Sequence, residues 1–222
     1  MNDITTIYIE GNVGAGKSTL LQFIRKHFDV QVLNEPHELW QNVGSDNLLE
    51  KFFKDQKRWA FTLQSYITLT RVQQLQQATK ENRNIVKIIE RSVYSARYCF
   101  AQNAFEMGLL TDLEWNLYQK FWDWDVSDHV PLPKGLIYLR IPASLCYERI
   151  MSRNRFEEQP ISLEYLTNLE TKHDDWLLHQ KQVDNLHNIP ILVLEDTKDL
   201  RSNISLQQDY VHKITMFLDS LS

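Results

Sequence analysis

The sequence lacks the features that mark membrane, secreted and zinc-binding proteins. None of its apolar runs approaches the roughly 18 residues that a transmembrane helix needs. The strand-like run at residues 4–10 is too short for the core of a signal peptide. Its two cysteines, Cys99 and Cys146, lie far apart and outside any CxxC or Cys/His cluster, which argues against a disulfide framework and a zinc site. We therefore expect a cytoplasmic protein with reduced thiols and no membrane partner.

An excess of basic residues is also missing. With 24 Lys and Arg against 29 Asp and Glu, the formal net charge is −5. Duplex binding needs a basic face, so we expect no nucleic-acid partner. A hydrophobic content of 43% and a charged content of 24% exclude wholesale disorder. The length suits one compact domain, which we assign to residues 1–222.

Glycine is scarce too, with six residues in all, yet Gly11, Gly14 and Gly16 fall within eight positions. They belong to the segment GNVGAGKS, which matches the phosphate-loop pattern G-x-x-x-x-G-K-[ST] between a strand-like run and an apolar-periodic helix. Backbone N–H groups there would cradle a phosphate, Lys17 would reach the β- and γ-phosphates, and Ser18 would ligate Mg²⁺. The alternative, a glycine-rich turn without a ligand, is disfavoured by the complete match in context. The predicted ATP-binding residues are Gly11, Asn12, Val13, Gly14, Ala15, Gly16, Lys17, Ser18 and Thr19.

Short apolar runs alternate with helix-like segments along the chain. The runs cover residues 5–10, 30–33, 85–89, 136–139 and 191–194. Helical spacing is seen at residues 18–28, 48–53, 59–78, 93–105, 111–124, 142–152, 163–179 and 209–221. The alternation predicts an α/β fold of the phosphate-loop NTPase or kinase type, with a five-stranded parallel sheet and helices on both faces.

Polar residues follow the second and third apolar runs, where the carboxyl ends of parallel strands would gather ligand-binding groups. Glu35 precedes Pro36, which keeps it out of helical geometry, and its carboxylate could accept a proton from an attacking hydroxyl. Glu90 ends the third run, where phosphate-loop enzymes often place the acid associated with Mg²⁺. Taken alone, Glu35 is more typical of a surface acid, and Glu90 also suits a solvated strand end.

A basic cluster follows the fourth run. It contains Arg149, Arg153 and Arg155, and the first two share a helix face by their i,i+4 spacing. Three guanidiniums near a helix end could close over a transferring γ-phosphoryl group and neutralise its oxygens. An isolated charge run is more often a solvated surface, but the phosphate loop favours the clamp.

Together these segments resemble the deoxynucleoside kinases, a family that includes deoxycytidine, deoxyguanosine and mitochondrial thymidine kinases and multisubstrate insect kinases. The resemblance rests on residues 11–18, Glu35-Pro36 with Trp40, and residues 58–66, 90–95, 137–139, 149–159 and 163–166. These segments follow the order and spacing of the family over nearly the whole chain.

The resemblance implies phosphorylation of the 5′-hydroxyl of a deoxyribonucleoside by ATP with Mg²⁺, in a homodimer with an arginine-rich lid at about residues 149–160. It gives Glu35 the role of general base and Arg91 that of orienting the hydroxyl and the base, while Ser18 and Glu90 hold the metal. The residues implied in catalysis are Glu35, Arg91, Arg149, Arg153 and Arg155. The residues implied in substrate binding are Glu35, Trp40, Phe53, Gln64, Arg71, Arg91, Ala96, Phe100 and Glu158; among them, Gln64 reads the base edge, Trp40 and Phe100 line the base, and Glu158 reads the 3′-hydroxyl.

Several positions depart from the family pattern. Phe53 stands where the family commonly has a tyrosine that shares the 3′-hydroxyl contact, and His37 replaces a small apolar residue. Arg71 resembles the deoxycytidine and deoxyguanosine kinases, which pair it with an aspartate where this chain has Ala96. Because Arg71 fills the space of a thymine methyl and is freed of that aspartate, we expect it to donate to a purine O6 or N7. Purine deoxynucleosides or deoxycytidine are then preferred over thymidine.

Two other functions fit parts of this pattern. A nucleoside monophosphate kinase would need no carboxylate base, because its acceptor already bears a phosphate, so Glu35-Pro36 and Gln64 argue against it. A non-catalytic nucleotide-binding switch would lack an acid, a base or a lid, whereas candidates for all three are present.

Overall fold

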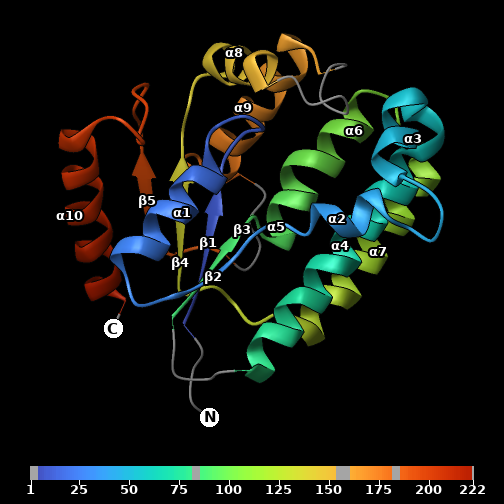
Figure 1. Ribbon diagram of the computed structural model, residues 1–222. Coiled ribbons are helices and arrows are strands. Elements are labelled where there is room, and N and C mark those ends of the chain that lie inside the picture. The colour runs from blue at the N-terminus through green and yellow to red at the C-terminus, as the bar shows by residue number, and fades with distance from the viewer. Residues whose placement is uncertain (1–4, 82–85, 154–160, 182–185, 222) are drawn as a thin grey trace.

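The computed structural model describes residues 5–81, 86–153, 161–181 and 186–221. Within them, five strands form one parallel sheet in the order β2-β3-β1-β4-β5 (Figure 1). The strands are β1 (Thr6–Glu10), β2 (Gln31–Leu33), β3 (Lys87–Glu90), β4 (Gly135–Leu139) and β5 (Ile191–Leu194). This sheet, with helices around it, confirms the predicted α/β fold.

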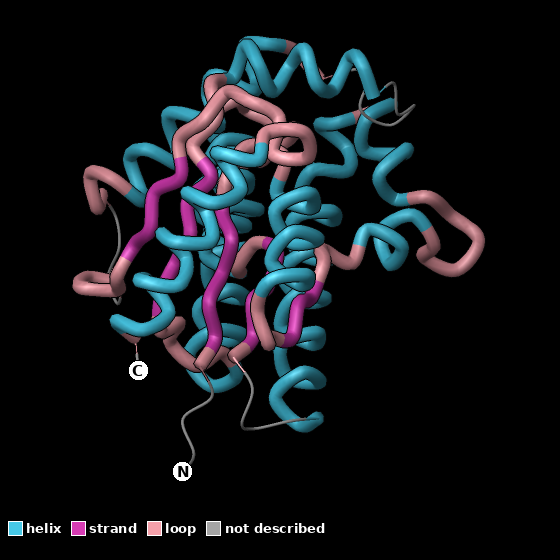
Figure 2. The backbone as a smooth tube through the Cα atoms, turned by 60° about the vertical axis from the view of Figure 1, so that its left-hand side comes forward, coloured by secondary structure: helices cyan, strands magenta, loops and turns pink. Residues whose placement is uncertain are grey.

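The helices cover both faces of the sheet, as Figure 2 shows from the side. They are α1 (Lys17–His27), α2 (His37–Gln41), α3 (Leu48–Lys54), α4 (Gln56–Glu81), α5 (Val93–Ser95), the π-helical turn η1 (Ala96–Ala101), α6 (Gln102–Glu106), α7 (Asp112–His129), α8 (Ala143–Arg153), α9 (Leu163–Leu177) and α10 (Ile204–Ser220). Within the part of the chain that the structure describes, none of these helices is long and apolar enough to cross a membrane.

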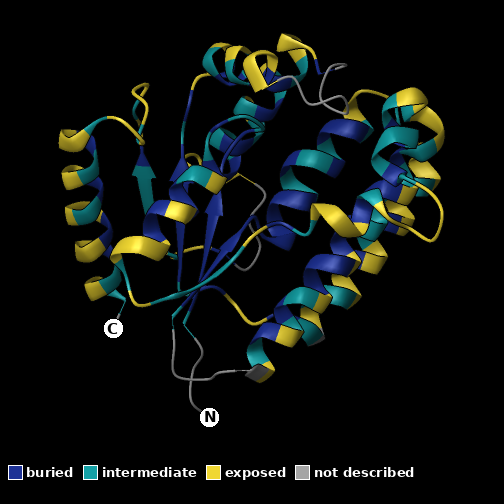
Figure 3. Ribbon diagram, in the orientation of Figure 1, coloured by how far each residue is buried: buried dark blue, intermediate teal, exposed yellow. Residues whose placement is uncertain are grey.

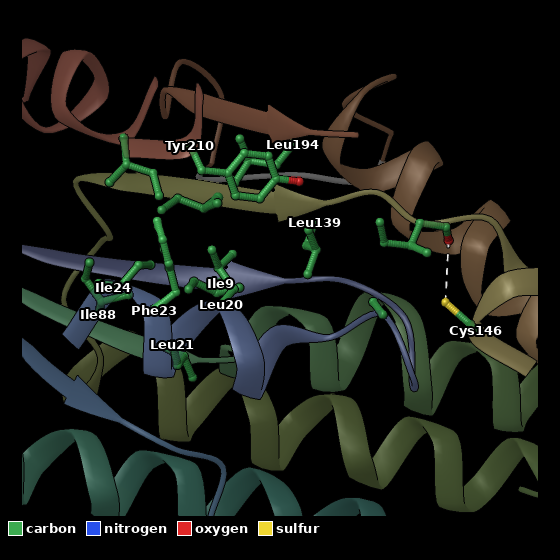
Figure 4. Packing of buried hydrophobic residues seen from close by; sticks show 14 of the residues in the cluster. Ile9, Leu20, Leu21, Phe23, Ile24, Ile88, Leu139, Cys146, Leu194 and Tyr210 are labelled. Atoms are coloured by element: carbon green, nitrogen blue, oxygen red, sulfur yellow. Dashed lines mark hydrogen bonds between the residues drawn. The ribbon is translucent and has the colours of Figure 1, made fainter. Parts of the chain in front are cut away.

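Strand alternation sends successive side chains to opposite faces and so divides the apolar interior. Ile7 and Ile9 of β1 join a first cluster with α1, α8 and α10 (Figure 4), whereas Tyr8 joins a second cluster with α4, α7 and α9. All five residues of β1 are buried, as expected for a central strand covered on both sides (Figure 3).

A third apolar cluster lies away from the sheet, among α2, α3, α4, η1 and α6. Its buried members include Trp40, Leu63 and Ala96. This cluster fixes the helices beside the carboxyl ends of β2 and β3, and it therefore shapes one side of the candidate site.

Several predicted helix boundaries were wrong. Thr111 and Glu114 do form the expected capping box, but α7 continues to His129 rather than ending near residue 124. The last helix begins at Ile204, because the Asn203 side chain accepts a hydrogen bond from the backbone N–H of Leu206. The helix predicted over 93–105 is interrupted by the π turn η1, and α2 was not predicted.

Candidate active site

The phosphate loop depends on glycine at two positions for steric as well as conformational reasons. Gly11 and Gly14 have φ values of 147° and 80°, a region that side chains rarely adopt. A Cβ atom on Gly14 would lie 2.6 Å from the carbonyl oxygen of Cys146 in α8, and one on Gly11 would lie 2.6 Å from that of Leu139. The loop is therefore packed directly against β4 and α8.

Lys17 closes the loop from the inside. Its Nζ donates to the carbonyl oxygens of Asn12 (2.7 Å) and Gly11 (3.1 Å). Burial of the ammonium, and to a lesser extent the positive charge of Arg91, lower the pKa of Lys17 to about 8. A buried ammonium held over loop carbonyls is placed to exchange them for phosphate oxygens when a nucleotide binds.

Ser18 and Glu90 lie side by side where α1 begins beside the end of β3. The Ser18 hydroxyl is 3.2 Å and 3.4 Å from the two carboxylate oxygens of Glu90. A hydroxyl and a carboxylate are hard oxygen donors of the kind that Mg²⁺ uses together with substrate phosphates. The two residues predicted to hold the metal are thus adjacent and chemically suited to it.

Glu35 lies at the centre of a buried charge cluster. One carboxylate oxygen accepts from Arg71 Nη2, and the other accepts from Arg91 Nη1 at 2.6 Å. The Nε2 atom of His37 also lies 3.1 Å from this second oxygen. Burial alone would raise the pKa of Glu35, but the charges of Arg91 and Arg71 outweigh it and hold that pKa well below its usual value. The carboxylate is consequently ionised at neutral pH.

Arg91 links this cluster to the phosphate loop. Its backbone adopts a left-handed φ of 58°, which is uncommon for a non-glycine residue. Its Nη2 donates to Gly11 O at 3.4 Å, and its guanidinium lies 4.8 Å from the centroid of the Phe100 ring. Backbone strain of this kind concentrates at functional sites. This backbone conformation turns the Arg91 side chain toward both Glu35 and the phosphate loop.

Sequence reasoning did not predict the hydrogen bonds between Glu10 and Ser92, the residue that follows Arg91. The carboxylate of Glu10, completely buried at the end of β1, accepts hydrogen bonds from the backbone N–H (2.8 Å) and the hydroxyl (2.5 Å) of Ser92. The Ser92 hydroxyl in turn caps α5. The signal for this contact was present, because parallel pairing of β1 with β3 sets Glu10 beside the residues that follow Glu90.

Predicted substrate residues surround the same cluster, but Arg71 is not free as expected. It is tied to Glu35, and its Nη1 donates to Ser92 O at 3.0 Å, because α4 crosses the ends of β2 and β3. Its guanidinium also lies 5.7 Å from the Trp40 ring centroid. Arg71 Nε, Arg91 Nε and Gln64 Oε1 are among the buried side-chain atoms for which the described residues offer no hydrogen-bond partner. Ala96 is completely buried on η1.

The remaining predicted residues are dispersed. Arg149 Nη1 donates to Ala15 O (2.9 Å) and its Nη2 to Thr197 O (3.5 Å), so it braces the phosphate loop. Arg153 is exposed at the end of α8, and Phe53 is half-buried between the first and third clusters. Arg155, Glu158 and most of the predicted lid lie outside the described residues.

The Asn12 side chain holds the phosphate loop against a neighbouring helix. Its Nδ2 donates to Leu166 O in α9 at 2.8 Å, and its Oδ1 accepts from the backbone N–H of Val13 at 2.8 Å. The side chain therefore fastens the loop to α9.

A phosphate loop beside a buried carboxylate, with the rings of Trp40 and Phe100 against the two arginines that hold it, defines a nucleotide-dependent phosphotransferase. The sequence matches the deoxynucleoside kinase family over residues 7–219, and the chain belongs to that family. It is 38% identical to deoxycytidine kinase 2 of Gallus gallus, over 96% of this chain and 90% of that protein. It is 36% identical to deoxycytidine kinase of Homo sapiens (98% and 92%) and 32% identical to mitochondrial deoxyguanosine kinase of Xenopus laevis (98% and 91%).

These comparisons confirm the resemblance inferred from the sequence motifs. The protein is an enzyme that phosphorylates deoxynucleosides with ATP. The two alternatives, a nucleoside monophosphate kinase and a non-catalytic switch, receive no support.

Proposed function

We propose that Glu35 is the general base of this kinase and accepts the proton of the 5′-hydroxyl as that oxygen attacks the γ-phosphorus of ATP. The hydroxyl O–H bond breaks, a new P–O bond forms, and the bond from the γ-phosphorus to the β-bridging oxygen breaks to leave ADP. The observation that carries this proposal is the buried Glu35 carboxylate, which Arg91 connects to Gly11 of the phosphate loop. A strong base is not required, because the transition state of phosphoryl transfer is loose.

The other charged residues position the donor and stabilise the charge that develops. Backbone N–H groups of the loop and the Lys17 ammonium would bind the β- and γ-phosphates. Ser18 and Glu90 would hold Mg²⁺, which neutralises charge on those phosphates when it is bound. Arg91 would orient the attacking hydroxyl, and the lid arginines Arg153 and Arg155 would complete the clamp.

The test of the base is a matched pair of variants. Glu35→Gln removes the proton acceptor, and we expect kcat to fall by about 10²–10⁴ with ATP binding nearly unchanged. Glu38→Gln, one turn away on the exposed side of α2, makes the same chemical change and should leave kcat unaltered. Turnover by Glu35→Gln near that of the wild type would remove Glu35 from the mechanism.

We also propose that deoxycytidine or purine deoxynucleosides are preferred over thymidine. Arg71 is fixed by Glu35 and by the Ser92 carbonyl, so it cannot move aside for a C5-methyl group. The buried Gln64 Oε1 needs a donor, which the amino group of cytosine or adenine supplies. A kcat/KM panel over the four deoxynucleosides tests this, and a clear preference for thymidine would refute it.

We propose further that the protein is a homodimer through the outer face of α7. Leu113, Leu117, Phe121 and Trp124 recur at helical spacing on this face, and Leu113 and Trp124 are 68% and 63% exposed. An apolar stripe of this kind is expected to be covered by a second copy. Phe121→Asp should convert dimer to monomer by sedimentation, whereas Met216→Asp, on the exposed side of α10, should not.

A further inference from the structure

Glu10, the last residue of β1, is completely buried but has no place in the mechanism proposed above. Side chains alternate along a strand, so Glu10 faces the same side of the sheet as Tyr8, the side that α4 covers. Its Oε1 atom accepts both hydrogen bonds from Ser92, and its Oε2 atom is buried without a hydrogen-bond partner among the described residues. Ser92 is therefore the residue through which Glu10 acts on its surroundings.

Ser92 touches both of the arginines that hold Glu35. It follows Arg91 directly in the chain, and its carbonyl oxygen accepts a hydrogen bond from Arg71 Nη1 at 3.0 Å. The guanidinium groups of both arginines form ion pairs with Glu35. A displacement of Ser92 would consequently disturb both arginines at once, and with them the carboxylate that they bind.

The left-handed backbone of Arg91 is held from both sides by β1. Its own N–H donates to Ile9 O at 3.0 Å, and the N–H of the next residue, Ser92, donates to Glu10. A non-glycine residue with a φ of 58° persists only where the surrounding structure fixes it. Because the backbone of Arg91 sets the direction in which its side chain leaves the chain, the hydrogen bond to Glu10 also fixes where the guanidinium points.

We propose that Glu10 is a positioning residue, which accepts both hydrogen bonds from Ser92 and so holds Arg91 and Arg71 in the orientation in which they bind Glu35. This inference rests on the proposed roles of Glu35 and Arg91. Glu10 takes part in no bond-making step, because what it supplies is an acceptor oxygen for two hydrogen bonds.

The size of the effect follows from the sensitivity of catalysis to geometry. A displacement of about 1 Å in a group that orients the reaction can lower the rate by about 10²-fold. Glu10→Ala leaves the backbone N–H and the hydroxyl of Ser92 without their acceptor, so we expect kcat to fall about 10- to 100-fold. Glu10→Gln keeps a carbonyl oxygen that can accept both hydrogen bonds, so it should restore kcat to within about threefold of the wild type.

The chain offers a matched control at the start of α7. One carboxylate oxygen of Glu114 accepts hydrogen bonds from the backbone N–H and from the hydroxyl of Thr111, both at 2.8 Å. The Thr111 hydroxyl caps α7 as the Ser92 hydroxyl caps α5. Glu114→Ala therefore breaks the same pair of hydrogen bonds at a helix that carries none of the residues assigned to catalysis.

The experiment compares wild type, Glu10→Ala, Glu10→Gln and Glu114→Ala below the melting temperature of each, using the best deoxynucleoside of the panel. Initial rates give kcat and the KM for the deoxynucleoside, and titration gives the dissociation constant for ATP. We expect Glu10→Ala to lower kcat and raise the KM for the deoxynucleoside, while its affinity for ATP stays within about threefold of the wild type. Glu114→Ala should leave all three quantities unchanged.

Three results would overturn the inference. The first is equal loss of kcat in Glu10→Ala and Glu10→Gln, which assigns the effect to the charge instead of the acceptor oxygen. The second is turnover by Glu10→Ala near that of the wild type. The third is a loss of ATP affinity as large as the loss of kcat, which places the effect in the phosphate loop, since Gly11 follows Glu10 directly.

A second pair of variants keeps the test available if Glu10→Ala does not fold. Ser92→Ala and Thr111→Ala each remove the hydroxyl from the corresponding pair of hydrogen bonds. Ser92→Ala should lower kcat with ATP affinity unchanged, and Thr111→Ala should not; equal kcat in these two variants would contradict the inference. Failure of the proposed base is recognised separately, because Glu35→Gln would then turn over like the wild type.

Discussion

The packing of α8 against the phosphate loop makes a sharp prediction for Gly14→Ala. The residue has a φ of 80°, and an added Cβ would lie 2.6 Å from the carbonyl oxygen of Cys146 and 2.9 Å from Cγ1 of Ile150. Gly108, after α6, has a similar φ of 70° but no atom within 4 Å of an added Cβ. Gly108→Ala is therefore a control that carries the same backbone penalty without the collision.

The two substitutions share one cost and differ in another. A left-handed conformation costs an alanine about 1–2 kcal/mol relative to glycine. Forcing extra atoms into a packed region adds about 1–3 kcal/mol, because backbone has to move. Gly14→Ala should therefore lower the free energy of unfolding by about 2 kcal/mol more than Gly108→Ala, which for a chain of this size means a melting temperature roughly 4–8 °C lower.

Calorimetry of the two purified variants measures this difference, and ATP titration measures its functional side. Because the collision falls between the loop and α8, Gly14→Ala should also weaken ATP binding, whereas Gly108→Ala should not. Equal melting temperatures for the two variants would show that the loop and α8 are not packed as described here. Lower stability with unchanged ATP affinity would show that the loop keeps its shape while α8 yields.

Two further predictions concern buried polar groups. Asn12→Ala removes the hydrogen bond to Leu166 O, so it should lower the free energy of unfolding in chemical denaturation by about 1–3 kcal/mol and raise the KM for ATP. Asn42 is an exposed asparagine after α2, and Asn42→Ala should change neither quantity. His173 is completely buried, and burial lowers its pKa to about 3, so the unfolded chain binds more protons than the folded one between about pH 6.5 and 3. The free energy of unfolding should therefore fall as the pH drops below 6.5, by up to about 1.4 kcal/mol per pH unit from this residue. His173→Gln should make the free energy of unfolding less dependent on pH between pH 7 and 5.5. An unchanged slope in that variant would contradict the burial of a neutral imidazole.

The sequence was sufficient for those features that local pattern encodes. The phosphate loop has a fixed spacing, and apolar runs ending in Glu35 and Glu90 identify strand ends, so the placement of Ser18 beside Glu90 followed from parallel pairing alone. The capping box at Thr111 is likewise a local signal.

Those local patterns did not predict the contacts between elements that are distant in the sequence. The pairing of Arg71 with Glu35 depends on how α4 crosses the sheet, and no periodicity within α4 specifies that angle. The bond from Asn12 to Leu166 joins residues 154 positions apart. The positive charge of Arg149 is evident from the sequence and led to its assignment to the clamp. Its bond to the Ala15 carbonyl oxygen could not be predicted, because the position of that oxygen depends on the folded backbone.

The partition of the apolar interior has a consequence for how such an enzyme diversifies. Trp40, Leu63 and Ala96, which form one side of the candidate site, belong to the third cluster, whereas Ala15 and Ile150 beneath the phosphate loop belong to the first. Substitutions within the third cluster can change that side of the site while the first cluster keeps its packing. Substitutions there can therefore alter the choice of acceptor without disturbing the packing that shapes the phosphate loop.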